Sequence, residues 1–199
     1  MSREMAPLPI AAAILAGGQA RRFGGIDKSR LVVGGRPIIF RQMDVLQRVA
    51  SSIFIVAGDA GRFAGLNVPV HADVVPGAGA LGGILTAVET AAESRVLVVA
   101  CDLPFLDAGL LALLAERAQG RDAAWVRTDR GVEPLLACYQ RSAARAIRKQ
   151  IEAGRLRAGD LSTALDIAEV GTKDVSRFGP PELLLANLNS PDDYQKLQS

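Results

Sequence analysis

Short runs of apolar and β-branched residues alternate along the chain with longer stretches in which apolar residues recur at helical spacing. The short runs are typical of strands buried on both faces, and the longer stretches are typical of amphipathic helices. Strands that alternate with helices favour a parallel sheet covered by helices on both sides. The predicted strands are Ile10–Leu15, Ser52–Ala57, Val68–Ala72, Arg95–Ala100, Ala123–Thr128 and Glu133–Tyr139.

Predicted helices fall between and after these strands. One begins at Pro37 and carries apolar residues as far as Val49, and another follows a glycine-rich loop, Gly77–Gly83, near Leu85–Ala92. Asp107 is a suitable N-cap for a third helix. We therefore expect one three-layer α/β domain, with a mostly parallel sheet, to account for residues 1–199. The remaining predicted helices are Leu110–Ala118, Ser142–Ala153 and a short one that starts at Ser190, and Gly154–Asp160 is predicted as a loop.

Composition limits the class of protein. A chain of 199 residues with 49% hydrophobic content has the size of one ordinary domain, and a net charge of +2 gives no support for bulk nucleic-acid binding. No apolar run approaches the ~18–20 residues of a membrane span. The two cysteines, Cys101 and Cys138, lie inside apolar runs, which favours free thiols in a reducing compartment. We expect a cytoplasmic protein with no nucleic-acid or membrane partner.

The first predicted strand leads into a segment rich in glycine and basic residues, Leu15–Leu31 (LAGGQARRFGGIDKSRL). Glycines let backbone N–H groups approach a ligand closely, and fixed cations around such a loop favour a polyphosphate. The segment is not a Walker A loop, because no Gly-Lys-Ser/Thr follows four spacer residues. A solvated glycine turn with surface basic residues is the alternative. The residues concerned are Gly17, Gly18, Gly24, Gly25, Arg21, Arg22 and Lys28.

Two carboxylates also follow predicted strands, so they should open onto the same edge of the sheet as the glycine loop. Asp102 ends the most apolar strand, where an ionised carboxylate needs compensation. A magnesium ion that bridges nucleotide phosphates would supply it, because Mg²⁺ takes one or two carboxylates plus phosphate oxygens. Asp73 could accept two hydrogen bonds from the N1–H and N2–H₂ groups of guanine. The alternatives are a helix-capping or loop carboxylate at Asp102 and a turn-forming one at Asp73.

Two further segments are candidates for ligand contact. Gly77-x-Gly79-x-x-Gly82 matches the dinucleotide fingerprint, with Asp102 twenty residues later, and so raises an NAD-linked enzyme as an alternative. That fingerprint normally occupies the first strand–helix turn, so we interpret the segment as a second glycine loop passing close to a base or ribose. Asn187 and Asn189 share a face if extended, and their amides suit a pterin or a phosphate; a turn leading into the last helix is the alternative.

In sequence order, these segments resemble the molybdenum cofactor guanylyltransferase family. The resemblance is carried by LAGGxxxRxGGxDK from Leu15 to Lys28, by His71-Ala72-Asp73 with the Gly77–Gly83 loop, by Cys101–Pro104 and by Asn187–Pro191. It extends from about Ile10 to Leu197. It implies a Rossmann-like nucleotidyltransferase fold of the nucleotide-diphospho-sugar transferase type. The nucleotide-binding half would be about residues 10–105 and the acceptor-binding half about 106–199.

The resemblance implies Mg²⁺-dependent transfer of GMP from GTP to molybdenum-bearing molybdopterin, giving the guanine dinucleotide and pyrophosphate. It implies GTP and molybdopterin as partners and leaves contact with other cofactor-biosynthesis or molybdoenzyme-maturation proteins open. The family matches a metal ligand at Asp102 and a guanine-nucleotide contact at Asp73. The expected catalytic residues are Arg22, Lys28 and Asp102, with Asp102 holding the metal. The expected nucleotide contacts are Leu15, Ala16, Gly17, Gly18, Lys28, Asp73, Leu81, Gly82 and Asp102, and the acceptor contacts are Asn187 and Asn189.

The chain departs from the family after the second strand, where Ile55–Gly58 stands in place of a segment that tends to carry Asn. A side-chain contact made there by the family would be lost or replaced by backbone. The alternatives left open are a cytidylyltransferase for the same cofactor, a sugar-phosphate nucleotidyltransferase and a non-catalytic nucleotide-binding regulator. Glu133 could also face the second substrate, and the Arg148–Arg157 region could face it or form a solvated helix surface. We expect His71 to be an ordinary packed or surface residue and Trp125 to lie in the core.

Overall fold

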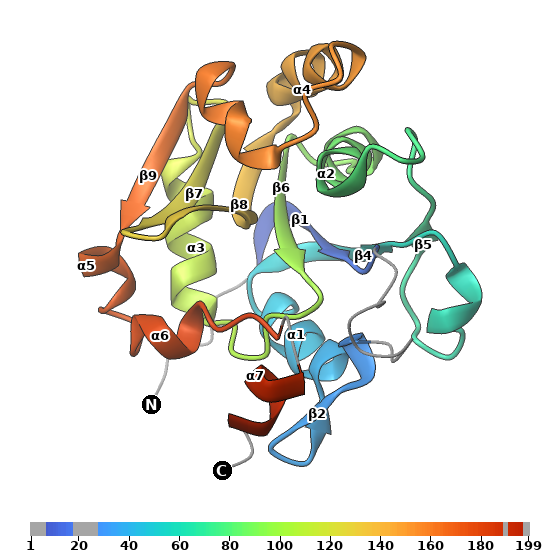
Figure 1. Cartoon of the computed structure of the whole chain (residues 1–199), viewed down its shortest axis with the longest axis vertical. Coiled ribbons are helices and arrows are strands. Elements are labelled where there is room, and N and C mark those ends of the chain that lie inside the picture. Colours follow the sequence, from blue (N-terminus) through green and yellow to red (C-terminus); the bar gives the residue numbers. More distant parts are fainter. Residues whose placement is uncertain (1–6, 18–27, 189–190, 197–199) are drawn as a thin grey trace.

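A seven-stranded sheet forms the centre of the molecule (Figure 1), in the order β5-β4-β1-β6-β8-β7-β9. The computed structural model describes residues 7–17, 28–188 and 191–196. Within this sheet only β8 runs antiparallel to its neighbours, so the expected mostly parallel sheet is confirmed. The strands are β1 Leu8–Leu15, β4 Ala50–Val56, β5 Val70–His71, β6 Arg95–Ala100, β7 Ala123–Thr128, β8 Gly131–Gln140 and β9 Ile167–Gly171, and a separate hairpin pairs β2 Val32–Val33 with β3 Arg36–Pro37.

Helices cover both faces of the sheet, which gives the expected three layers (Figure 1). Alternate residues of β1 separate the two cores: Ile10 and Ile14 pack with α1 and α3, whereas Ala13 and Leu15 pack with α2 and α4. Both cores are therefore built from one central strand that carries apolar residues on both faces. The longer helices are α1 Ile38–Leu46, α2 Gly79–Thr90, α3 Ala108–Arg117 and α4 Ala144–Glu152.

A third, smaller cluster brings the C-terminal segment to the β2–β3 hairpin. Leu188 packs there against Leu31, and the Tyr194 hydroxyl donates a hydrogen bond of 2.8 Å to the Val32 carbonyl. Residues 188 and 194 thus lie next to residues 31 and 32, which follow the glycine-rich segment after β1. The short helices are α5 Thr172–Val175, α6 Pro181–Leu184 and α7 Pro191–Lys196, with 3-10 turns η2 Lys28–Arg30, η3 Ala60–Phe63, η4 Arg141–Ala143 and η5 Ala158–Thr163.

Most predicted elements are confirmed, and the errors have physical causes. The Gly77–Gly83 segment is a loop only as far as Ala78, because α2 already begins at Gly79. Gly77 and Gly79 have φ of 86° and 60°, conformations that favour glycine, so the turn is real but shorter than predicted. Part of the predicted Gly154–Asp160 loop belongs to η5. No helix in the described part of the chain is long and apolar enough to cross a membrane.

Candidate active site at the carboxyl edge of the sheet

The strand order creates a switch point between β1 and β6. From β1 the chain moves outward to β4 and β5, and then returns through α2 to β6 on the other side of β1. In open α/β sheets the ligand crevice lies outside the carboxyl ends of the strands at such a point. Leu15 pairs with Ala100 in the register, and the Cys101 N–H donates to the Leu15 carbonyl at 3.1 Å. The loops that carry Gly17 and Asp102 therefore start side by side.

The end of β1 is open at this edge of the sheet. The Ala16 N–H donates to the Val56 carbonyl at 2.9 Å, which fixes the strand end against β4. Gly17 is exposed, and no atom from outside its immediate neighbours lies within 4 Å of the position that a Cβ would occupy. Gly18 and Arg22 lie outside the described residues. Lys28 begins η2, but its side chain is also outside the described part.

Asp102 sits in a turn that the C-terminal segment contacts directly. The Leu188 N–H donates to the Asp102 carbonyl at 3.1 Å, although the two residues are far apart in sequence. Asn187, which is half-buried, therefore lies next to the turn, as expected of a residue in the same site. Asn189 is outside the described residues. The structure thus places one of the two predicted acceptor-binding residues, Asn187, next in sequence to the residue that bonds to the Asp102 turn.

Glu133 is a second carboxylate near this edge, on the strand next to the one that leads to Asp102. β8 pairs with β6 in antiparallel register up to Leu136 opposite Val99, and Glu133 lies beyond this end of the pairing. Burial raises the pKa of Glu133, while Arg130 lowers it and the charge of Asp102 raises it. The charge of Asp102 is the smallest of these three influences, and it acts as a like charge that disfavours ionisation of Glu133.

This pair fits a divalent ion that also binds phosphate. Both side chains carry carboxylate oxygens, the type of ligand that hard cations such as Mg²⁺ prefer. Among the described residues, no group of three or more His, Cys, Asp or Glu side chains could hold a metal by itself. One or two carboxylates with phosphate oxygens completing the shell are typical of Mg²⁺ at nucleotide sites.

Asp73 follows β5 at the same edge and is partly buried. Burial raises the pKa of its carboxyl group above the ordinary value. The next residue, Val74, donates its N–H to the Thr86 hydroxyl at 3.0 Å, and that hydroxyl donates to the Gly82 carbonyl at 2.8 Å. The loop that carries Asp73 is therefore anchored to the first turns of α2.

The helical start of α2 changes the expected role of its glycines. Leu81 is fully buried, and the Gly82 N–H already donates to the Ala78 carbonyl at 3.3 Å. A Cβ at Gly82 would lie 3.0 Å from the Val75 carbonyl oxygen, so this glycine allows close packing of the helix against the preceding turn. Contact of Leu81 and Gly82 with a nucleotide stays a prediction, and their burial leaves only the backbone of the first helical turn to make it.

Several other candidates have ordinary structural surroundings. The His71 ring packs edge-on against Phe54 with centroids 5.4 Å apart, and Trp125 is fully buried, as expected. Burial raises the pKa of the Cys138 thiol to about 12, so this cysteine is not a reactive thiolate. Arg148 of α4 forms a 2.7 Å ion pair with Glu89 of α2. Arg148 therefore connects two helices, which favours the solvated-surface interpretation of that region.

Comparison with known proteins gives consistent results over nearly the whole chain. A family model described as the MobA-like NTP transferase domain matches residues 12–165. A protein of Chloroflexus aggregans named probable molybdenum cofactor guanylyltransferase is 34% identical, covering 94% of this chain and 92% of its own. The molybdenum cofactor guanylyltransferase of Cereibacter sphaeroides is 33% identical, covering 94% of both chains. The crystal structure of molybdopterin-guanine dinucleotide biosynthesis protein A from Archaeoglobus fulgidus superposes with a TM-score of 0.80 at 26% identity, covering 94% and 96%.

Proposed function

The chain belongs to the MobA-like NTP transferases, and we propose that it transfers GMP from GTP to molybdopterin that carries molybdenum, releasing pyrophosphate. The observation that carries this proposal is the agreement between full-length relatives of that name and the geometry of the switch point. There, Asp73 and Asp102 follow strands on either side of the open end of β1. In this proposal Asp73 reads the guanine base and Asp102 holds the metal ion.

The residues of the site align two polyanions and offset their repulsion. The terminal phosphate of the acceptor has a second pKa near ~6, so it is already largely anionic at neutral pH and needs no general base. We propose that the backbone of Leu15, Ala16, Gly17 and Gly18, with Arg22 and Lys28, binds the triphosphate and stabilises charge on the departing pyrophosphate. Nucleotidyltransferases of this family use a divalent metal ion; we propose Mg²⁺, with Asp102 as its ligand and Glu133 beside it. Such an ion supplies positive charge to the phosphates when bound.

Base selection is assigned to Asp73 in this proposal. A carboxylate accepts hydrogen bonds from N1–H and N2–H₂ of guanine together, a pattern that adenine and cytosine do not present. The anchoring of Val74 through Thr86 to α2 supports the assignment, since a base-reading side chain needs a fixed loop. Ile55–Gly58 departs from the family pattern, so a side-chain contact made there by the family would be lost or replaced by backbone, and this departure counts against guanine selection rather than for it.

Binding of the acceptor, molybdopterin, is assigned to the second half of the chain. We propose a nucleotide-binding half of about residues 10–105 and an acceptor-binding half of about 106–199. The hydrogen bond from Leu188 to Asp102 supports this division, because it places Asn187 next to the turn at which the two substrates would meet. Asn187 and Asn189 would then contact the pterin or its phosphate. A cytoplasmic location is also part of this proposal, supported by Cys101 and Cys138, which are thiols rather than disulfide partners of one another.

Pyrophosphate release measured with purified protein, Mg²⁺, GTP and molybdenum-bearing molybdopterin tests the proposal directly. We expect release that requires both substrates and a product with the mass of the guanine dinucleotide. Competition among the four nucleoside triphosphates separates the alternatives within the class, because a cytidylyltransferase would prefer CTP. Replacing the pterin with sugar phosphates tests the remaining enzyme alternative. Binding of GTP without turnover would indicate a regulator and contradict the proposed transfer.

A further inference from the structure

A glutamine side chain occupies the apolar face of α1. Gln42 is 1% exposed and lies on the helix face that also buries Ile38, Ile39 and Leu46. Burying an amide in such surroundings is unfavourable unless its hydrogen-bonding groups find partners. The Nε2 group of Gln42 finds two, donating to the Ala100 carbonyl at 2.7 Å and to the Leu103 carbonyl at 2.9 Å.

The two accepting carbonyls bracket Asp102. Ala100 is the last residue of β6, and Leu103 closes the turn with a 3.4 Å hydrogen bond from its N–H back to the Ala100 carbonyl. Gln42 therefore holds both ends of the turn that carries the proposed metal ligand. The side chain reaches this turn across about sixty positions of sequence, from a helix that supplies no other proposed site residue.

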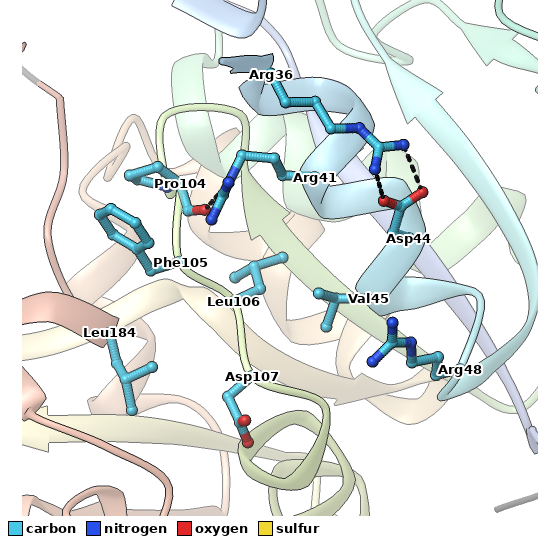
Figure 2. Close-up of a pocket in the computed structure, with 10 residues that line it drawn as sticks. All are labelled: Arg36, Arg41, Asp44, Val45, Arg48, Pro104, Phe105, Leu106, Asp107 and Leu184. Carbon is cyan, nitrogen blue, oxygen red and sulfur yellow. Dashed lines mark hydrogen bonds and ion pairs between the residues drawn. The ribbon is translucent and has the colours of Figure 1, made fainter. Parts of the chain in front are cut away.

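The neighbouring residue on α1 continues the same contact. The Arg41 Nε donates to the Pro104 carbonyl at 3.1 Å, and the guanidinium lies over the Phe105 ring, 5.4 Å from its centroid. Figure 2 shows Arg41 extending from α1 toward Pro104, in a pocket that both residues help to line. Consecutive residues of α1 thus donate to three carbonyls of the segment that runs out of β6.

The orientation of the Gln42 amide follows from these partners. Turning the amide over would place its oxygen against two carbonyl oxygens, so the NH₂ group must face the turn. The Oε1 atom then has no hydrogen-bond partner among the described residues. A buried acceptor without a hydrogen-bond partner lowers the stability of the folded protein. The stabilising contribution of the Gln42 amide therefore comes from the two hydrogen bonds that its Nε2 group donates.

We propose that Gln42 is a positioning residue for nucleotidyl transfer: its amide fixes the Ala100–Leu103 turn so that the Asp102 carboxylate is held ready for a metal–nucleotide complex. The inference rests on the proposed function for the identity of the reaction. Groups that orient a metal ligand typically contribute ten- to a hundredfold to metal affinity or activity. Gln42 does not touch the substrates, and it acts only through the turn.

The test compares Gln42→Met, which keeps the volume but donates no hydrogen bond, with Gln150→Met. Gln150 is a matched control because it is 4% exposed, also has an Oε1 without a partner among the described residues, and lies in α4 on the opposite face of the sheet. The measurements are the Mn²⁺ affinity of the protein–GTP complex by electron paramagnetic resonance, kcat and KM for transfer, and Tm. We expect Gln42→Met to weaken Mn²⁺ binding and lower kcat by roughly ten- to a hundredfold, with KM for the pterin unchanged. Gln150→Met should change Tm alone.

Gln42→Asn gives a second measurement if Gln42→Met does not fold, because the shorter amide cannot reach both carbonyls but keeps a polar group. It should show the same loss of Mn²⁺ affinity. A Gln42 variant with lowered Tm but normal Mn²⁺ affinity and kcat would overturn the inference and leave Gln42 a structural residue. Wild-type protein that binds GTP and Mn²⁺ without transferring GMP would contradict the proposed function, while the Mn²⁺ comparison would still decide the role of Gln42.

Discussion

Replacing Asp73 with asparagine should remove most of the preference for guanine. The substitution keeps the size of the side chain but replaces one acceptor oxygen with a donor that faces the N–H groups of the base. Hydrogen bonds to a charged group contribute about 1.5–3 kcal/mol, which corresponds to a roughly ten- to hundredfold change in affinity. Asp73 is partly buried, so water replaces these bonds less well than it would at an open surface. We therefore expect the GTP-to-CTP affinity ratio to fall by this factor.

Calorimetric titration with GTP, ITP, CTP and ATP checks this expectation. Inosine lacks the N2 amine, so wild-type protein should bind ITP more weakly than GTP, and Asp73→Asn should narrow that gap. Affinity for CTP and ATP should change little, which serves as the internal control for folding and for the phosphate site. An equal loss across all four nucleotides would refute the reasoning, since Asp73 would then support the ribose, the metal or the loop.

The same residue predicts a pH dependence whose sign can be worked out. Burial raises the pKa of Asp73, so protonation begins at a higher pH than for an ordinary aspartate. A protonated carboxyl accepts one hydrogen bond less well, and guanine preference should decline as pH falls through that range. Because the folded protein holds this proton more tightly than the unfolded chain, ionised Asp73 does not stabilise the fold. Asp73→Asn should therefore not lower Tm at neutral pH, and its weakened guanine preference should not change as pH falls.

The other predictions concern the metal, the acceptor and α2. Asp102→Asn should keep Tm but lower the rate of pyrophosphate release by roughly a hundred- to a thousandfold at saturating Mg²⁺; a near-normal rate would contradict its role. Asn187→Ala should raise KM for the pterin and leave the GTP dissociation constant unchanged, whereas loss of GTP binding alone would place this residue in the other half of the site. Gly82→Ala should lower Tm more than Gly83→Ala, because its new Cβ would meet the Val75 backbone oxygen at 3.0 Å rather than a Leu15 methyl group. Both changes gain about 1 kcal/mol of helix propensity, so an equal Tm would mean that the Val75 contact does not restrict α2.

The parallel part of the sheet could be predicted because the apolar runs and helix caps in the sequence there match the burial and the element boundaries that the fold imposes. β6 has the predicted bounds, Arg95–Ala100, since a run buried on both faces is apolar at every position. Asp107 caps α3 as expected, with its Oδ1 accepting from the Leu110 N–H at 2.9 Å. In both cases a few adjacent residues are enough to predict the element, without knowledge of its tertiary contacts.

Elements whose patterns carry little hydrophobic contrast were not predicted. β9 pairs only with β7 at the sheet edge, and Glu169 on it forms a 2.6 Å ion pair with Arg127. Such a half-exposed edge strand has no continuous apolar run. The start of α2 was misplaced for a different reason. Glycine usually ends helices, but Gly82 lies within one because the backbone of Val75 approaches too closely for a side chain.

The same distinction explains which site residues could be found from sequence. Asp73 and Asp102 each lie two positions past the end of a parallel strand, and in a parallel sheet that position alone brings them to one edge. Glu133 is positioned by the register of an antiparallel strand, which a one-residue change would alter, so its sequence position alone is only a weak indication of a site residue. Gln42 acts through the packing of α1 on the turn after β6. Its one local sign is an amide among the apolar positions of a helix, and the reason for that amide lies in two carbonyls that only the fold places opposite it.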